Sequence, residues 1–534
     1  MPKKTQYIVV TGGVISGLGK GIFTASLGKL LQSRGFKVVP IKIDPYMNVD
    51  AGTMNPIEHG EVFVLDDGSE VDMDLGTYER FLDINLKSEN NITTGKIYQK
   101  VIEKEREGKY LGKTVQIIPH ITDEVQNWFR KVAEDYKAEI IMIEIGGTVG
   151  DIENLVFLEA CRQLSLKEDV VFVHCTLVPV MSVVGEQKTK PTQQSVQKLR
   201  EIGIMPHFLF CRAHEQIKPK IKEKLSLFCG LPEENVISGP DLDSIYKLPL
   251  ILEEQGVTKK VLEKLGLVPK KKDMKDWEQT VRNMVNAKKI VNIAITGKYT
   301  ELHDSYVSIM ESLKASCGKL GVKIKIKWIE TTDIENKKVK VADALKAIDG
   351  IIVPGGFGPR GTEGKIECIR YARERKIPFL GLCYGFQLAT IEFSRNVCGL
   401  KNANSTEIDP NSPYPVIDLL PEQRKIYKKG GTMRLGGHDV IIRKGTLASR
   451  VYGSLSTRER FRHRWEFVPK YREKVECKGF VFSGHDKSGN IMQILELNGH
   501  PFFMASQFHP EFTTRVLKPN PLFLNFLKAA SKNA

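Results

Sequence analysis

The stretch "YIVVTGGVISGLGKG", residues 7–21, decides the fold of the first half of the chain. A short β-branched apolar run leads into a glycine-rich turn, and a helical pattern follows from residue 22. A strand, a glycine loop with Lys20 and a helix form the arrangement in which backbone N–H groups and a helix N-terminus surround phosphate oxygens. The alternative is a plain glycine turn. We expect a phosphate site, although its spacing is one residue longer than G-x-x-x-x-G-K, and Gly21 replaces the usual Mg²⁺-binding hydroxyl residue.

Short apolar runs alternate with helical patterns in both halves of the chain. Runs of this kind are typical of parallel strands buried on both faces. The proline- and lysine-rich stretch "GLVPKKKDMKDWEQT", residues 266–280, interrupts the alternation, and a new first strand begins near residue 289. The sequence therefore predicts an α/β protein with two three-layer domains at 1–268 and 289–534, joined by a linker at 269–288.

The composition excludes several classes of protein. The 534 residues are 27% charged and 41% hydrophobic, and we find no uninterrupted apolar run of 18 residues, so we expect no membrane span and no signal peptide. Nine scattered cysteines without a C-x-x-C pair favour a reducing compartment, and we expect a cytoplasmic protein. The net charge of +15 comes without a nucleic-acid-binding motif, so we expect no nucleic acid and attribute the excess lysine to nucleotide substrates.

Carboxylates elsewhere are candidates to hold the Mg²⁺ that Gly21 cannot bind. Asp72 and Asp74 lie two residues apart, and Glu144 interrupts an otherwise apolar strand. A carboxylate in such a strand is costly to bury unless it is paired or bound to a metal. We expect Asp74 and Glu144 to bind the metal, with a solvated loop acid and a buried salt bridge as the alternatives.

A second anion site is predicted in "GEQKTKPTQQSVQKL", residues 185–199. Two lysines, a hydroxyl and an amide surround a proline just before a helix, and a helix N-terminus favours anions. These residues are Lys188, Thr189, Lys190 and Gln193.

The second half contains a candidate nucleophile in "IPFLGLCYGFQLA", residues 377–389. Cys383 lies between two glycines, as the nucleophile of a G-x-S-x-G elbow does, at a helix start that favours the thiolate. The stretch "ASQFHPEF" supplies His509 as a base and Glu511 to orient it, and "IIVPGGFGPRG" supplies Gly355 and Gly356 for an oxyanion hole. A lone histidine would more often be structural, but the three pieces together predict nucleophilic catalysis.

These motifs carry a resemblance to known families. The order PGGFG, GLCYGFQ, QFHPEF resembles the class I glutamine amidotransferases, which release ammonia from glutamine with a Cys–His–Glu triad. The whole chain resembles the CTP synthase family through long stretches, among them "GGVISGLGKG", "KIDPYMNVDAGTMNPIEHGEVFVLDDG", "DLGTYERF", "YLGKTVQIIPHIT", "IEIGGTVGDIE", "GEQKTKPTQ", "DSIYKLP", "NANSTE", "GGTMRLG" and "RHRWE". The resemblance implies a dethiobiotin-synthetase-like first domain and a flavodoxin-like second domain.

The resemblance also implies an activity and its partners. ATP would phosphorylate the 4-oxygen of UTP, and ammonia passed through an internal channel would displace the phosphate to form CTP, in pyrimidine nucleotide biosynthesis. Mg²⁺ would be the cofactor, GTP an allosteric activator and CTP a feedback inhibitor. The implied assembly is a homotetramer built as a dimer of dimers, in which a neighbouring subunit completes the UTP site.

Matching positions in the first domain give the implied nucleotide contacts. For ATP they are Ser16, Gly17, Leu18, Gly19, Lys20 and Gly21 at the phosphates, with Arg212 and Asp241 near the adenine. For UTP and CTP they are Ser16, Lys42, Asp151, Ile152, Glu153, Lys188, Thr189, Lys190, Gln193, Lys224 and Phe228. Lys42 would lie against the reacting phosphates, and Glu153 and Phe228 at the base and ribose of CTP. Asp74 and Glu144 match the metal ligands.

In the second domain the implied glutamine contacts are Gly356, Phe357, Tyr384, Gln387, Glu407 and Arg464. His59 falls in the stretch that gates the family's ammonia passage, and Arg360 and Arg434 fall in the GTP-responsive lid. The elbow departs from the usual G-I-C-L-G-M-Q at Leu382, Tyr384 and Phe386, which changes the bulk around the thiol but not its chemistry.

Two rival interpretations use the same motifs. A related amidotransferase could aminate another acid, such as a corrinoid side chain, although "GEQKTKPTQ" argues against it. A structural filament protein could keep the fold without activity, although the intact Lys20, Cys383, His509 and Glu511 argue against that.

Overall fold

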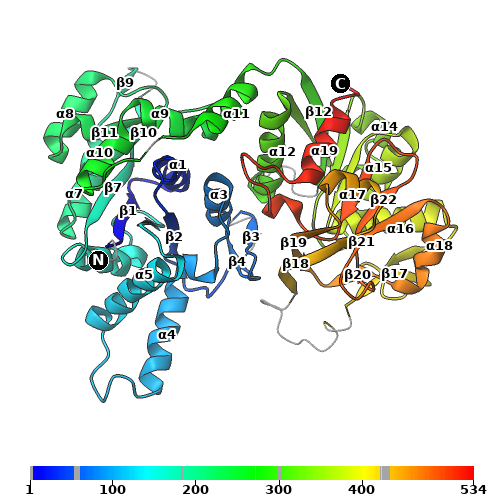
Figure 1. Ribbon diagram of the computed structural model, residues 1–534, viewed down its shortest axis with the longest axis horizontal. Helices are drawn as coiled ribbons and strands as arrows, with labels where there is room; N and C mark the ends of the chain where they lie inside the picture. The colour runs from blue at the N-terminus through cyan, green and yellow to red at the C-terminus, as the bar shows by residue number, and fades with distance from the viewer. Residues whose placement is uncertain are drawn as a thin grey trace. The chain divides into compact units, whose positions relative to one another are not determined.

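The computed structural model describes residues 4–52, 54, 60–181, 185–270, 272–297, 303–420, 423 and 433–534 (Figure 1). The chain forms two compact units. The first comprises Met1–Ala51 and Asp74–Glu278, and the second comprises Gly52–Met73 and Gln279–Ala534. Residues 52–73, which the sequence assigns to the first domain, therefore pack with the second unit.

The first unit is built on a seven-stranded sheet in which every pairing is parallel, as predicted. The strands, in spatial order, are β11 (Val236–Pro240), β10 (Phe208–Ala213), β7 (Val170–Leu177), β1 (Gln6–Gly12), β6 (Ile140–Ile145), β2 (Val38–Asp44) and β5 (Asn91–Thr93). The described helices around it are α1 (Lys20–Ser33), α3 (Met73–Leu82), α4 (Thr94–Arg106), α5 (Thr122–Tyr136), α6 (Leu155–Leu164), α7 (Lys190–Glu201), α8 (Pro219–Cys229), α9 (Leu248–Glu254) and α10 (Val257–Lys264).

Alternation along the buried strands sorts the side chains between the two faces of this sheet. On one face, Tyr7 and Val9 belong to a core with Phe129 of α5 and Phe157 of α6. On the other face lies α1, whose Phe23 ring is 4.6 Å from the ring of Phe210 on β10. Figure 1 shows α1 and α5 on opposite sides of β2, so the unit has the predicted three layers.

The register of the central strands brings charged residues into one row. Val10 of β1 and Lys42 of β2 both pair with Glu144 of β6. Side chains of directly paired residues point to the same face of a sheet. The register therefore places Lys42 beside Glu144 before any side-chain contact is considered.

The second unit contains a nine-stranded mixed sheet. Its strands, in spatial order, are β13 (Lys323–Glu330), β12 (Ile290–Gly297), β14 (Gly350–Val353), β15 (Phe379–Leu382), β23 (Phe503–Ser506), β22 (Met492–Leu497), β21 (Phe480–His485), β18 (Arg434–Ile442) and β19 (Ser456–His463). The first five run parallel, and the remaining pairings are antiparallel. A small sheet is formed by β16 (Ala403–Ser405), β17 (Tyr414–Leu419) and β20 (Trp465–Phe467).

Helices cover both faces of the larger sheet, which confirms the predicted α/β class for this unit as well. One core includes residues of α15 (Thr362–Arg375) and α16 (Tyr384–Asn396), and the other includes residues of α12 (Val307–Leu320) and α19 (Pro521–Ala530). The shorter described helices are α13 (Thr331–Glu335), α14 (Val341–Ala344), α17 (Leu447–Tyr452) and α18 (Arg472–Glu476).

Part of the predicted linker is helical. Residues 269–288 contain α11 (Lys275–Asn286), and the boundary between the two units falls inside this helix. Trp277 is 1% exposed, its ring lies 5.1 Å from that of Phe81, and its indole N–H donates to the carbonyl of Tyr246 at 2.9 Å. A charged sequence with sparse apolar residues thus forms a helix, and Trp277 is the largest of its buried side chains, which also include Val281.

Replacing Trp277 tests the contribution of this buried side chain. We expect Trp277→Ala to lower the free energy of unfolding of the first unit by about 3–5 kcal/mol, because it empties a buried aromatic site. Val268 is 83% exposed, so Val268→Ala serves as a control with little effect. Urea unfolding followed by circular dichroism measures both variants, and equal stabilities would contradict that contribution.

Candidate active sites of the two units

Cys383 lies at a sharp turn between β15 and α16. Its backbone has φ 49° and ψ −94°, a conformation that is rare for residues other than glycine. A Cβ at Gly385 would lie 2.2 Å from the carbonyl oxygen of Val353, and one at Gly381 would lie 2.9 Å from the backbone of Gly385. Both flanking glycines are therefore needed sterically, and the strained turn presents the thiol at the start of a helix.

The imidazole of His509 approaches this turn from the neighbouring strand. His509 follows β23, which pairs with β15 through Leu382 and Ser506. Its Nδ1 is 2.7 Å from a carboxylate oxygen of Glu511. A Cβ placed on Gly355 would lie 3.1 Å from His509 Cε1 and 3.8 Å from Cys383 Cβ. The predicted thiol, imidazole and carboxylate thus come together beside the glycine loop that follows β14.

Electrostatics keep His509 protonated. Burial by itself would lower the pKa of its imidazole, but the Glu511 carboxylate and the Cys383 sulfur outweigh burial and raise this pKa to about 10. An imidazolium at neutral pH stabilises an adjacent thiolate and can protonate a leaving amine. Within the described residues the buried Nε2 makes no hydrogen bond of ordinary geometry, and the group that acts on the imidazole besides Glu511 is the Cys383 thiol, so Nε2 remains available for that proton transfer.

Two further groups contact the thiol. Cys383 Sγ lies 3.6 Å from the backbone carbonyl of Arg462, and the side-chain amide of Gln507 donates to Sγ at 3.6 Å. Sequence reasoning missed both residues. Gln507 stands in the same "SQFHPEF" stretch as His509, and that closeness is the signal that would have found it.

The residues implied for glutamine surround the turn. Tyr384 donates through its hydroxyl to the carbonyl of Gly358 at 2.9 Å, and the Gly358 amide donates to Glu407 at 3.0 Å. A Cβ on Gly356 would lie 3.8 Å from the Tyr384 ring. These contacts connect the glycine loop to the elbow, and they place Gly356 next to the thiol's helix.

The other implied residues of this unit lie at varied depth. Gln387 is buried and donates to the carbonyl of Trp465 at 2.8 Å, and Arg464 donates to Gln423 at 2.7 Å. Phe357 and Arg360 are exposed. Arg434, the other residue that the resemblance implies for the lid, begins β18 with its guanidinium 5.5 Å from the ring centre of Phe461. His59 and residues 424–432 lie outside the described residues.

The glycine loop of the first unit has the geometry of a phosphate cradle. Gly17 and Gly19 have φ of 72° and 82°, which only glycine adopts readily, and no acidic residue lies in the first turn of α1. Ser16 and Gly17 are exposed, Gly19 is half-buried, and Leu18 and Gly21 are buried. Open backbone amides thus stand before a helix whose own first turn contains no acidic residue.

Lys20, the first residue of α1, folds back over the loop. Its ammonium donates to the carbonyl of Gly147 at 3.0 Å, and a Cβ on Gly12 would lie 2.7 Å from Nζ. Lys20 is 8% exposed, so its ammonium lies on the buried side of the loop. The strand end at Gly12 must be glycine for the lysine to take this path.

Two carboxylates converge on Lys42. Its ammonium contacts Asp74 and lies 3.2 Å from Glu144, and a third carboxylate, Asp44, is 3.8 Å away. Tyr78 donates to the second oxygen of Glu144. Burial raises the pKa of Glu144, although the lysine charge opposes that shift. The carboxylates are therefore brought together as predicted, but Lys42 joins them in an ion-pair cluster that the sequence had left as an alternative to metal binding.

The same carboxylates have the chemistry for Mg²⁺. They offer hard oxygen donors, and a Cβ on Gly21 would lie 2.4 Å from Asp74 Oδ1, so the loop backbone directly adjoins this carboxylate. Within the described residues, no group of three or more His, Cys, Asp or Glu side chains is arranged to hold a metal. A metal held by Asp74 and Glu144 would therefore need phosphate oxygens or water to complete its ligands.

A cavity of about 470 Å³ opens beside the phosphate loop. Its lining includes Gly17 and Leu18 from the loop, Val178 after β7, and the predicted adenine contacts Arg212 and Asp241. Arg212 is held in place by an ion pair with Asp241 at 2.7 Å. An apolar wall with a few fixed polar groups next to a phosphate cradle is suited to a nucleotide base.

The second anion cluster lies at the start of α7. Thr189 accepts from the Gln193 amide at 3.0 Å, and Lys190 is the exposed first residue of the helix. Lys188 bonds Glu186 at 2.6 Å, and that bond together with the nearby charge of Lys224 lowers the pKa of Glu186. The charges of lysines from two separate segments therefore both act on Glu186.

The remaining implied nucleotide contacts are exposed. They are Asp151, Ile152 and Glu153 in the loop after β6, and Phe228 near the end of α8. The β6 loop adjoins the phosphate loop, because the amide of Val149 donates to the carbonyl of Gly12 at 2.7 Å.

Comparison with known proteins assigns both units. Residues 6–267 match the family described as CTP synthase N-terminus, and residues 301–529 match the class-I glutamine amidotransferases. The chain is 56% identical over 530 residues to the CTP synthase of Thermococcus gammatolerans, covering 98% of each protein. This chain belongs to the CTP synthase family.

Other members of the CTP synthase family match equally broadly. The enzyme of Archaeoglobus fulgidus is 55% identical over 530 residues, covering 99% of this chain and 98% of the relative. Among solved structures, the glutaminase domain of the Trypanosoma brucei enzyme with bound acivicin is 36% identical, with a TM-score of 0.43, and covers 45% of this chain and 94% of that one. No helix in the described ranges is long and apolar enough to cross a membrane.

The acidic partner of His509 offers a test of the triad. Glu511→Gln removes the carboxylate that raises the His509 pKa, so this pKa should fall towards the ordinary histidine value. A glutaminase reaction that needs the imidazolium is lost as pH rises through the His509 pKa. We therefore expect the alkaline limb of kcat/KM for glutamine hydrolysis, near pH 10 in the unmodified protein, to move to lower pH.

The control is Glu476→Gln, which removes a carboxylate bound to Arg443 and Arg472. Its pH profile should match that of the unmodified protein. An unchanged alkaline limb in Glu511→Gln would contradict the assigned role of Glu511.

Proposed function

We propose that this enzyme converts UTP to CTP with ATP and with ammonia released from L-glutamine. One observation carries the proposal: a chain matched end to end by CTP synthases contains both a thiol–imidazole–carboxylate cluster and a lysine-lined phosphate loop. The first cluster is suited to releasing ammonia, and the second to activating its acceptor. ATP would phosphorylate the 4-oxygen of UTP, and ammonia would displace that phosphate.

Ammonia release begins at Cys383. Its thiolate attacks the glutamine carboxamide carbon, and the backbone amides of Gly356 and Tyr384 stabilise the resulting oxyanion. His509 gives its proton to the departing ammonia, which leaves a thioester on Cys383. Water then attacks the thioester, with His509 taking its proton, and releases glutamate and the thiolate. Supporting this sequence are the raised His509 pKa and the buried Nε2 that remains available for proton transfer.

Glutamine would be held by residues around this centre. We assign its binding to Gly356, Phe357, Tyr384, Gln387, Glu407 and Arg464. The bonds that join Tyr384 and Glu407 to Gly358 support the assignment, because they hold the loop in one position beside the thiol.

In the first unit we assign the loop of residues 16–21 to the phosphates of ATP. Lys20 supplies charge along the buried side of the loop, and Lys42 lies next to the carboxylates that would face the reacting phosphate. Asp74 and Glu144 would hold Mg²⁺, which neutralises phosphate charge when it is bound. The cavity lined by Arg212 and Asp241 would take the adenine.

UTP would bind near the start of α7 through Lys188, Thr189, Lys190 and Gln193, with Lys224. The proximity of Lys188 and Lys224 to one carboxylate supports a shared triphosphate site. A triphosphate bound there would replace Glu186 as the partner of Lys188.

Regulation and assembly follow the family pattern in this proposal. CTP would inhibit by binding at Asp151, Ile152, Glu153 and Phe228, and GTP would activate through Arg360 and Arg434. Ile152 and Phe228 are large apolar side chains that are 82% and 54% exposed in the single chain. Exposed apolar side chains of this kind support a contact with another subunit, as in a homotetramer. Ammonia would travel through an internal passage, and His59, assigned to it, lies outside the described residues. All nine cysteines are free thiols, which supports a cytoplasmic location.

Removing the thiol separates the two reactions. We expect Cys383→Ala to lose glutamine-dependent CTP synthesis but to keep synthesis from added ammonia, because only the ammonia source is removed. Lys20→Ala should lose both. Cys477 is an exposed free thiol, so Cys477→Ala is the matched control and should keep both activities. CTP formation is followed by chromatography; loss of the ammonia-dependent reaction in folded Cys383→Ala would refute the two-site assignment.

The metal assignment is tested by binding. We expect Asp74→Asn and Glu144→Gln each to weaken the binding of Mn²⁺, measured together with a non-hydrolysable ATP analogue, by about tenfold or more. The reason is that each change removes one charged ligand. Paramagnetic resonance measures free Mn²⁺ directly, without reliance on turnover. Glu233→Gln alters an exposed carboxylate elsewhere in the unit and should leave the affinity unchanged. Equal affinities in all variants would overturn the assignment.

A further inference from the structure

A hairpin from the early part of the chain belongs to the second unit. It consists of β3 (Val62–Val64) and β4 (Glu70–Asp72), which pair antiparallel. In sequence it lies between β2 and α3, but its residues pack with the unit that contains the Cys383 centre. The hairpin is drawn in blue in Figure 1, because it comes early in the chain.

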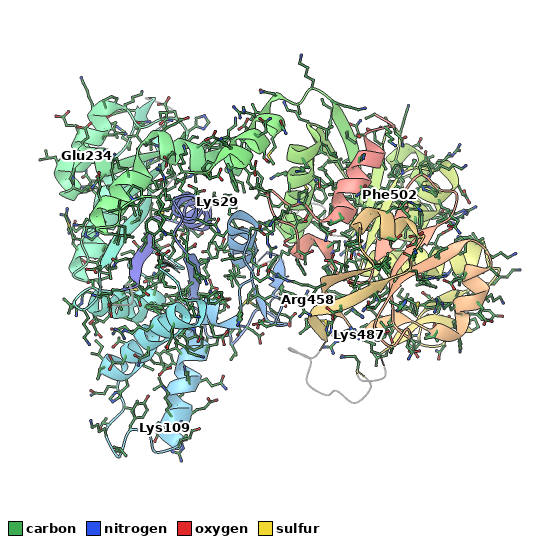
Figure 2. All side chains as sticks on the ribbon, viewed as in Figure 1. Lys29, Lys109, Glu234, Arg458, Lys487 and Phe502 are labelled. Carbon is green, nitrogen blue, oxygen red and sulfur yellow. The ribbon has the colours of Figure 1, made fainter. Side chains whose placement is uncertain are left out.

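Strand β19 contacts the hairpin through arginines at every second position. Side chains two residues apart on a strand point to the same face. The row comprises Arg458, labelled in Figure 2, Arg460 and Arg462. Their hairpin partners, in the same order, are Asp66 Oδ1 at 3.1 Å, the Val64 carbonyl at 3.1 Å and Glu70 Oε1 at 2.7 Å.

Glycines on β18 allow the hairpin turn to approach closely. The amide of Gly437 donates to the carbonyl of Asp66 at 2.8 Å, and a Cβ there would lie 2.0 Å from the Asp66 carboxylate. At Gly436, a Cβ would lie 2.6 Å from the backbone of Gly68. The hairpin is therefore fitted to this sheet through contacts that larger residues would block.

The innermost ion pair leads directly to the thiol. The Glu70 side chain is 2% exposed and forms an ion pair with Arg462 at 2.7 Å. The backbone carbonyl of the same Arg462 lies 3.6 Å from Cys383 Sγ. A buried ion pair holds both partners in one geometry, since breaking it leaves a charge without compensation. Glu70 therefore restrains the carbonyl that faces the nucleophile.

A second path leads from the hairpin to the imidazole. The Phe63 ring lies 5.0 Å from that of Phe512, and the Phe512 ring is stacked on His509 with centres 5.0 Å apart. Arg460 joins this path, because its guanidinium bonds both the Val64 carbonyl and the Phe512 carbonyl, and its own carbonyl accepts from the His509 amide at 2.8 Å. The hairpin is thus connected to Cys383 through Arg462 and to His509 through Phe512.

We propose that the β3–β4 hairpin is a positioning element of the glutamine-hydrolysing centre, with Glu70 acting through Arg462 on Cys383 and Phe63 acting through Phe512 on His509. This inference rests on the proposed glutaminase function of the second unit. Neither hairpin residue touches the reacting atoms. Their effect is on the distance and alignment of thiol and imidazole, on which the rate of attack depends steeply.

The test compares Glu70→Gln with Arg443→Gln, a variant of an arginine–carboxylate pair elsewhere in the same unit, Arg443 with Glu476. Full-length proteins are assayed for glutamine hydrolysis, for CTP synthesis from added ammonia, and for alkylation of Cys383 by iodoacetamide across pH. We expect Glu70→Gln to lower kcat for glutamine hydrolysis between about 10- and 100-fold and to shift the alkylation profile. The ammonia-dependent rate should not change, and Arg443→Gln should resemble the unmodified protein in all three assays.

A charge reversal keeps the proposal falsifiable if single variants are unstable. The pair Glu70→Arg with Arg462→Glu should recover at least part of the hydrolysis that either single change loses, and Phe63→Leu should lose less than Phe63→Ala. Unchanged hydrolysis and alkylation in folded Glu70→Gln would overturn the inference, as would losses that follow thermal stability alone. If the unmodified protein hydrolyses no glutamine, the proposed function fails instead, so the two failures are distinguishable.

Discussion

Close backbone approach at the end of a buried strand is the constraint on which both sites depend. In the first unit, Gly12 leaves room for the Lys20 side chain and Gly21 leaves room for Asp74. In the second unit, Gly381 and Gly385 let β15 turn into α16 within one residue. Each glycine lacks the Cβ that would collide with a neighbouring backbone or functional side chain. The chemistry of each unit is thus a consequence of how tightly a strand meets its following helix.

Burial then decides the charge state of the groups gathered there. His509 is buried, yet its pKa rises because a carboxylate and a sulfur flank it. Glu144 is also buried, and its pKa rises despite the lysine beside it, since desolvation dominates. Burial therefore disfavours the charged form in both units, and the outcome depends on the neighbours: Glu511 and Cys383 outweigh burial at His509, whereas Lys42 does not outweigh it at Glu144.

Sequence reasoning recovered features that are local in the chain. The strand–loop–helix around Lys20 and the elbow around Cys383 follow from glycine spacing, and the His509–Glu511 contact joins residues two positions apart. Contacts set by tertiary packing were not recoverable. The ion pairs of Lys42 and the arginine row facing the hairpin depend on register and on distant segments. Trp277 shows the same limit, because it is buried in a helix that forms in a stretch whose composition indicates a linker.

The path of the chain through residues 52–73 makes each of the two units discontinuous in sequence. The backbone leaves the first unit after Ala51, returns to it at Asp74, and leaves it again after Glu278, so three covalent crossings join the units. A cut at α11 would release a second unit without its hairpin and a first unit with a foreign segment still attached. Separate genes for the two activities could not be made by one division of this sequence.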